Sequence, residues 1–155
     1  MKARWIITAV SAALFFGGGL FTSLQDPWFQ NLQRPGWLTF EALIPFIWTF
    51  IWACLTISAI IVWEKISKQG SRPWYLMFCY AAIAILTSAY SPVVVELRSL
   101  TGGLVLGGLA TLLVYILAFI VRPISRTASW LFLPYALWGP IGTYVTWVLI
   151  QLNTP

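Results

Sequence analysis

The side chains in this 155-residue sequence that could do chemistry are mainly aromatic rings and hydroxyl groups. The chain has ten tryptophans and no histidine, so it lacks the usual general base and the usual haem and zinc ligand. The two cysteines, Cys54 and Cys79, fall inside apolar segments, and their spacing matches no metal or redox motif. We therefore expect no catalytic residue, no metal site and no required cofactor. Enzymatic activity is disfavoured, although tryptophan radicals at Trp48 or Trp138 remain open.

Several of these residues share a helix face if the apolar segments are helical, because residues three or four apart are neighbours on a helix. Three such sets occur: Trp48 with Trp52, Thr87 with Tyr90, and Trp138 with Gly142 and Thr146. Tryptophan is bulky, and its N–H needs a partner that lipid cannot supply. Helix packing is one interpretation of these sets. The other is a flat-walled pocket for a large, planar, apolar ligand.

The segments that carry these residues are predicted to cross a lipid bilayer. The sequence is 60% hydrophobic and 8% charged, which is more apolar surface than a water-soluble domain of this size can bury. Each of five uncharged runs can span about 30 Å of hydrocarbon as a helix. We predict one all-α integral membrane domain over 1–155, a bundle of five transmembrane helices with an aromatic first-loop lid at 25–42. The predicted spans are about 5–24, 43–63, 74–95, 100–121 and 129–151.

Basic residues set the predicted orientation. Of nine Lys and Arg residues, Arg34 and Arg98 lie on one side of the predicted membrane and the remainder on the other, with the N-terminus. The positive-inside rule then places the N-terminus in the cytoplasm. We expect an integral membrane protein, of a bacterial inner membrane. The first segment could instead be a secretory signal, but glycines interrupt it and no small-residue cleavage site ends it. The scattered basic residues form no patch, so no nucleic-acid partner is expected.

The connection between the first two predicted spans is unusually aromatic. Residues 28–40, WFQNLQRPGWLTF, hold four Trp and Phe side chains broken by Pro35 and Gly36. A connector that only joins two helices can be short and polar. We therefore expect this loop to cover something apolar.

Three separate segments resemble the translocator protein or tryptophan-rich sensory protein family, TspO/MBR. They are WFQNLQRPGW in the first loop, PFIW in the second span and WLFLPYALW in the fifth. The first fits the family pattern W-[FY]-x-x-L-x-[KR]-P-x-W, and the likeness covers nearly the whole chain. It implies a five-helix bundle with a ligand cavity under the first loop, usually as a homodimer. Gly103 and Gly107 form a G-x-x-x-G step that permits close helix approach, within the bundle or between protomers.

The resemblance implies a membrane receptor, sensor or carrier that binds a tetrapyrrole (porphyrin, haem precursor or bilin) or another planar apolar small molecule. The alternatives are a transporter of such ligands or a tetrapyrrole-degrading enzyme. Transport by the usual mechanisms is disfavoured because no charge lies near the middle of a span. Arg34 is the candidate partner for propionate groups. The expected ligand-binding residues are Phe29, Arg34, Pro35 and Trp37 in the lid, and Trp48, Trp52, Thr87, Tyr90, Ala110, Val114, Trp138, Gly142 and Thr146 in the spans.

This sequence departs from the family pattern where amides are usual. Ile83, Thr87 and Thr146 stand at those positions, so the pocket should be less polar and ligand preference could differ. The W-x-P-P that the family usually has at the first-loop tryptophan is replaced by Trp37-Leu38-Thr39-Phe40. No basic residue follows Arg126, so sterol recognition is not expected.

Overall fold

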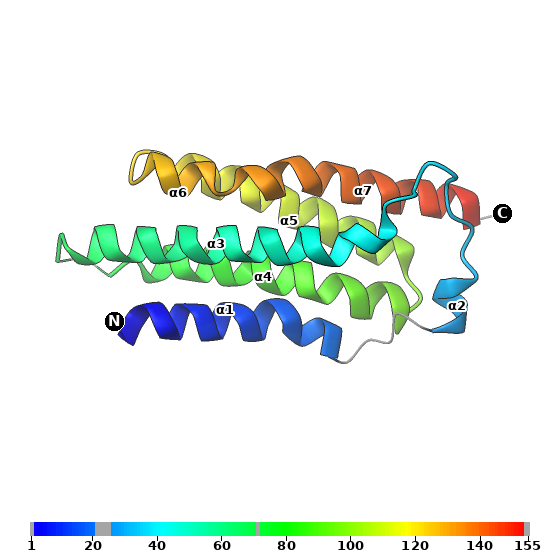
Figure 1. Ribbon diagram of the computed structural model, residues 1–155, viewed down its shortest axis with the longest axis horizontal. Helices are drawn as coiled ribbons and strands as arrows, with labels where there is room; N and C mark the ends of the chain where they lie inside the picture. Colours follow the sequence, from blue (N-terminus) through cyan, green and yellow to red (C-terminus); the bar gives the residue numbers. More distant parts are fainter. Residues whose placement is uncertain (1, 21–25, 71, 154–155) are drawn as a thin grey trace.

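The computed structural model describes residues 2–20, 26–70 and 72–153, without the side chains of 18–20. Within these ranges all regular structure is helical: α1 (Lys2–Leu20), α2 (Pro27–Gln30), the 3₁₀ helix η1 (Glu41–Leu43), α3 (Ile44–Ser67), α4 (Trp74–Val95), α5 (Leu100–Val121), α6 (Arg126–Trp130) and α7 (Leu133–Asn153). The long helices α1, α3, α4, α5 and α7 run along one bundle, with the N-terminus and the C-terminus at opposite ends (Figure 1).

Three described helical segments are long and apolar enough to cross a membrane: Glu41–Ser67, Trp74–Val95 and Leu100–Val121. The predicted all-α membrane bundle is thereby confirmed, while the count of five spans stays a prediction. Helix α7 contains two prolines, four Trp and Tyr residues and the amides Gln151 and Asn153, whereas Leu, Val and Ile dominate α5. This composition leaves α7 less apolar than α5.

The helix ends follow local sequence signals. In α5, Ser99 caps the first turn by accepting a hydrogen bond from the Gly102 backbone N–H at 3.0 Å. The fifth predicted span is broken into α6 and α7, because the chain turns at Leu131 and Phe132 before the proline at position 134. Phe132 fills the break and is 1% exposed.

Small residues let the helices approach closely. Helix α4 packs between α1 and α5, and α7 packs on the other flank of α5. A Cβ added at Gly103 would overlap the Val94 side chain of α4, and one at Gly107 would lie 3.4 Å from the Thr143 hydroxyl of α7. Both glycines of the G-x-x-x-G step therefore face neighbours within the same chain.

Residues 26–43 lie across one end of the bundle, at the end where the C-terminus is found (Figure 1). The end of the first predicted span and residue 25, where the predicted lid begins, lie outside the described residues. Here the lid means residues 26–43. It begins with α2, whose N-cap Asp26 accepts hydrogen bonds from the backbone N–H groups of Trp28 (2.9 Å) and Phe29 (3.3 Å). At the other end of the bundle, Arg4 of α1 pairs with Glu64 of α3, with Nη2 and Oε2 3.0 Å apart.

Candidate functional site

Aromatic rings from three different helices and the lid form two sets of contacts, which are linked through Tyr135 and Trp138, about one turn apart in α7. The Trp48 ring of α3 meets Tyr135 of α7 edge to face, with centroids 5.5 Å apart, and Phe15 of α1 lies 6.1 Å from Trp48. Phe40 of the lid meets Trp138 of α7 at 6.2 Å and 72°. We call Phe15, Phe40, Trp48, Tyr135 and Trp138 the aromatic centre. Its membership shows that the lid reaches into the bundle rather than only joining two helices.

Two tyrosine–threonine pairs lie beside the aromatic centre. The Tyr135 hydroxyl is 2.6 Å from the Thr87 hydroxyl, and Tyr90 is 2.7 Å from Thr146. Each threonine also donates to a carbonyl in its own helix, Thr87 to Ile83 and Thr146 to Gly142. The tyrosines are therefore the donors in both pairs. Thr87 and Thr146, two of the positions where the resemblance implies amides, thus hold hydroxyls that are satisfied within the protein.

Trp138 carries the one buried side-chain nitrogen or oxygen, within the described part of the chain, that has no hydrogen-bond partner. Its Nε1 lies near Gly142, where an added Cβ would be 3.9 Å away. A buried donor without a partner is costly, and native structures rarely leave one without a reason. This N–H is suited to an acceptor atom on a bound molecule.

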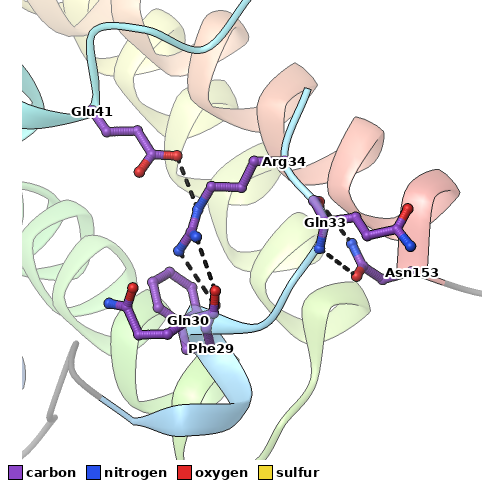
Figure 2. A network of polar contacts seen from close by, with 6 residues as sticks. All are labelled: Phe29, Gln30, Gln33, Arg34, Glu41 and Asn153. Carbon is purple, nitrogen blue, oxygen red and sulfur yellow. Dashed lines mark hydrogen bonds and ion pairs between the residues drawn. The ribbon is translucent and has the colours of Figure 1, made fainter. Parts of the chain in front are cut away.

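Arg34 is held within the lid. Its Nε lies 3.0 Å from Glu41 Oε1, and its other nitrogens donate to the backbone carbonyls of Gln30 (3.2 Å) and Phe29 (3.3 Å), as Figure 2 shows. The guanidinium also lies 5.5 Å from the centroid of the Phe29 ring. The expected propionate partner therefore already ties the two ends of segment 34–41 together.

Trp37 lies outside the aromatic centre, and Trp52 adjoins it through Phe16, whose ring contacts Phe15 at 5.3 Å. Trp37 is 46% exposed and stacks at 6.0 Å on Tyr144, which in turn stacks on Trp147, so this row follows the outer face of α7. Trp52 donates from Nε1 to the Ser11 hydroxyl at 3.0 Å and meets Phe16 of α1. Its indole N–H is satisfied at the α1–α3 contact.

Four of the remaining expected site residues belong to apolar clusters, whereas Pro35 is half-buried in the lid and belongs to neither cluster. Ala110 and Val114 of α5 are fully buried in the same apolar cluster as Trp48 and Trp138. Phe29 and Tyr90 belong to a second apolar cluster at the lid end of the bundle. The expected residues that lie in apolar clusters are thus divided between two clusters rather than gathered around one cavity.

Two hollows open at the surface of the described residues. One of about 420 Å³ lies at the lid end, and its lining includes Trp28, Arg98 and Asn153. The other, of about 430 Å³, is a shallow groove between α5 and α7 that includes Tyr144 and Trp147. Neither hollow is lined by a residue of the aromatic centre. A ligand at Trp138 would have to displace the Phe40 ring.

Sequence reasoning did not select Phe15, Phe40 or Tyr135 as site residues. A signal for Tyr135 was present, because it lies three residues before Trp138 and so shares its helix face. Phe40 stood in the aromatic loop, but its partner depends on how the loop folds back. Nothing in the sequence marks Phe15, which reaches the aromatic centre through the packing of α1 against α3.

Comparison with known proteins identifies several relatives. Residues 6–152 match the sequence model of the TspO/MBR family. The chain is 26% identical over 147 residues to "Uncharacterized membrane protein YtaB" of Bacillus subtilis (95% of this chain, 94% of that protein). It is 22% identical over 152 residues to "Tryptophan-rich protein TspO" of Bacillus cereus (98% and 97%). It is also 24% identical over 128 residues to "Tryptophan-rich sensory protein" of Cereibacter sphaeroides (83% and 78%).

Proposed function

The chain belongs to the TspO/MBR family of membrane proteins, and from this premise we propose that it is a receptor, sensor or carrier that binds a tetrapyrrole. Porphyrins, haem precursors and bilins are the ligand classes, with other planar apolar molecules as competitors. A sensing role is supported by the name of one relative, a tryptophan-rich sensory protein. The aromatic centre is the proposed site, and no cofactor is needed besides the ligand.

The unpaired Trp138 Nε1 is the observation that carries this proposal. It provides a hydrogen-bond donor among flat aromatic walls, directly beneath the lid residue Phe40. A planar ligand could take the place of the Phe40 ring against Trp138 and supply the missing acceptor. Stacking on aromatic faces and a few placed polar groups are the usual features of sites for large apolar ligands.

The other expected residues have supporting roles in this proposal. Tyr90 and Thr87 would border the ligand on the α4 side, Thr146 and Gly142 on the α7 side, and Ala110 with Val114 would form the floor. Phe29, Arg34, Pro35 and Trp37 would shape the lid. Trp52 would act indirectly, through the packing of α3 against α1.

The test is a fluorescence titration of the detergent-purified protein with protoporphyrin IX and with a bilin, using tryptophan quenching. We expect saturable binding that weakens about tenfold in Trp138→Phe, because a hydrogen bond and part of the stacking surface are lost. Trp74→Phe is the control, since Trp74 is exposed at the start of α4. Binding that is absent, or equally strong in Trp138→Phe, would refute the site.

We further propose the orientation that follows from the charge distribution: the lid faces the outside of a bacterial inner membrane, and the N-terminus faces the cytoplasm. Homodimer formation is proposed on the family resemblance alone. Flux across proteoliposomes and analysis of products after illumination would separate binding from transport and from tetrapyrrole breakdown.

A further inference from the structure

The last turn of α7 holds the lid through one side chain. Asn153 accepts a hydrogen bond from the Gln33 backbone N–H at 2.8 Å and donates one to the Gln33 carbonyl at 3.0 Å, so it pairs with both backbone groups of one residue (Figure 2). The same amide donates to the Leu149 carbonyl at 2.9 Å, one turn earlier in α7. That third bond fixes the amide on the helix, so the lid is attached to a rigid element.

The attachment point is next to the residue that shapes the inner part of the lid. Gln33 precedes Arg34, whose ion pair with Glu41 closes segment 34–41. That segment ends beside Phe40, the ring that covers Trp138. Because the segment is closed on itself, fixing Gln33 also limits where Phe40 can lie.

The attachment is also easy to break. Both Gln33 bonds lie at an exposed position, where water can replace either partner. Asn153 lines the hollow of about 420 Å³ at the lid end, so open space rather than packed core lies beside it. Releasing this contact requires no cavity to form in the bundle.

We propose that Asn153 is a latch: it holds the lid closed over the aromatic centre, and its release sets the rate at which ligand enters and leaves. The gating half of this proposal rests on the proposed function, whereas the latch itself does not. In this proposal the Gln33 bonds re-form over the bound ligand once the Phe40 ring has moved aside, so that the latch is closed in the empty and the occupied protein alike. It should therefore change both rates together and the affinity very little.

The first arm of the test needs no ligand. Hydrogen–deuterium exchange of lid peptides is compared in the full-length protein, Asn153→Ala and Gln151→Ala; Gln151 is an exposed amide on the same helix. We expect exchange at Gln33 to rise about tenfold in Asn153→Ala, as the loss of one or two exposed hydrogen bonds predicts, and not in Gln151→Ala. Asn153→Asp keeps the acceptor for the Gln33 N–H but loses the donor to the Gln33 carbonyl. Exchange at Gln33 in this variant should therefore lie between that of the unaltered protein and that of Asn153→Ala. Exchange that is unchanged in Asn153→Ala would overturn the latch.

The second arm measures association and dissociation of protoporphyrin IX by stopped flow. In Asn153→Ala we expect both rates to rise by about the same factor as the lid exchange, with little change in Kd. A looser lid with unchanged ligand rates would overturn the gating. If the unaltered protein binds no porphyrin, the proposed function fails. Hydrogen–deuterium exchange then still tests whether Asn153 holds the lid.

Discussion

At the scale of single residues, the site consists of polar groups that have been paired within the protein, with one exception. Tyr90, Tyr135 and their threonine partners satisfy one another. Trp138 Nε1 is left without a partner among the described residues. The hydrocarbon core of a membrane holds no water that could accept a hydrogen bond from such a donor, whereas water does so at an aqueous surface. The unpaired indole therefore distinguishes the proposed binding position from the aromatic packing around it.

Removing either side chain of the Tyr90–Thr146 pair should lower the free energy of unfolding by a different amount. Thr146→Val leaves the Tyr90 hydroxyl without its acceptor inside the bundle, and we expect it to lower the free energy of unfolding by about 1–3 kcal/mol. Tyr90→Phe should cost less, because Thr146 keeps its bond to the Gly142 carbonyl. Chemical denaturation in detergent measures both, and the double variant should be more stable than Thr146→Val alone. Equal costs for the two single variants would show that the pair is not formed.

At the scale of elements, the sequence predicts the helices better than the lid. The ends of α4 and α5 fall at the residues expected for the third and fourth segments, because charged residues flank both uncharged runs. The break between α6 and α7 was not foreseen, since Phe132 packs into the core and hides the turn from a hydropathy pattern. Within the lid, the sequence shows which residues are aromatic but not the direction in which each side chain points. Trp37 stacks outside on Tyr144 while Phe40 points inside to Trp138, which depends on backbone geometry and distant partners.

Gly103 makes the tighter of two glycine contacts between α4 and α5, the other being Gly102 against Val93. A Cβ at Gly103 would overlap Val94 and lie 3.1 Å from the Tyr90 ring, so Gly103→Ala should destabilise the bundle by about 1–3 kcal/mol. Gly108→Ala on the same helix is the control, because an added Cβ there meets nothing within 4 Å. Since alanine favours helix over glycine, Gly108→Ala should be neutral or slightly stabilising. Thermal unfolding in detergent would compare them, and a neutral Gly103→Ala would contradict the packing.

At the scale of the whole molecule, the two ends of the bundle differ in how they are tied. At the N-terminal end, a side-chain ion pair between Arg4 and Glu64 links α1 to α3. At the other end, Asn153 binds the backbone of the lid, and Arg34 closes the lid on itself. A site that opens through the lid end would meet the aqueous phase on whichever side of the membrane that end faces. The orientation of the chain therefore decides which compartment supplies the ligand.

The proposed orientation predicts which loops react from outside. Asn31→Cys places a thiol on the exposed lid, and Gln69→Cys places one in the connection at the opposite end; the native Cys54 is buried and Cys79 half-buried. In spheroplasts of a bacterial host, a membrane-impermeant maleimide should label position 31 directly and position 69 only after permeabilisation, because the basic residues of the 64–72 connection favour the cytoplasm. The unaltered protein, treated in the same way, measures background labelling of the native cysteines. The reverse labelling pattern would place the lid in the cytoplasm, and the proposed site would then draw its ligand from inside the cell.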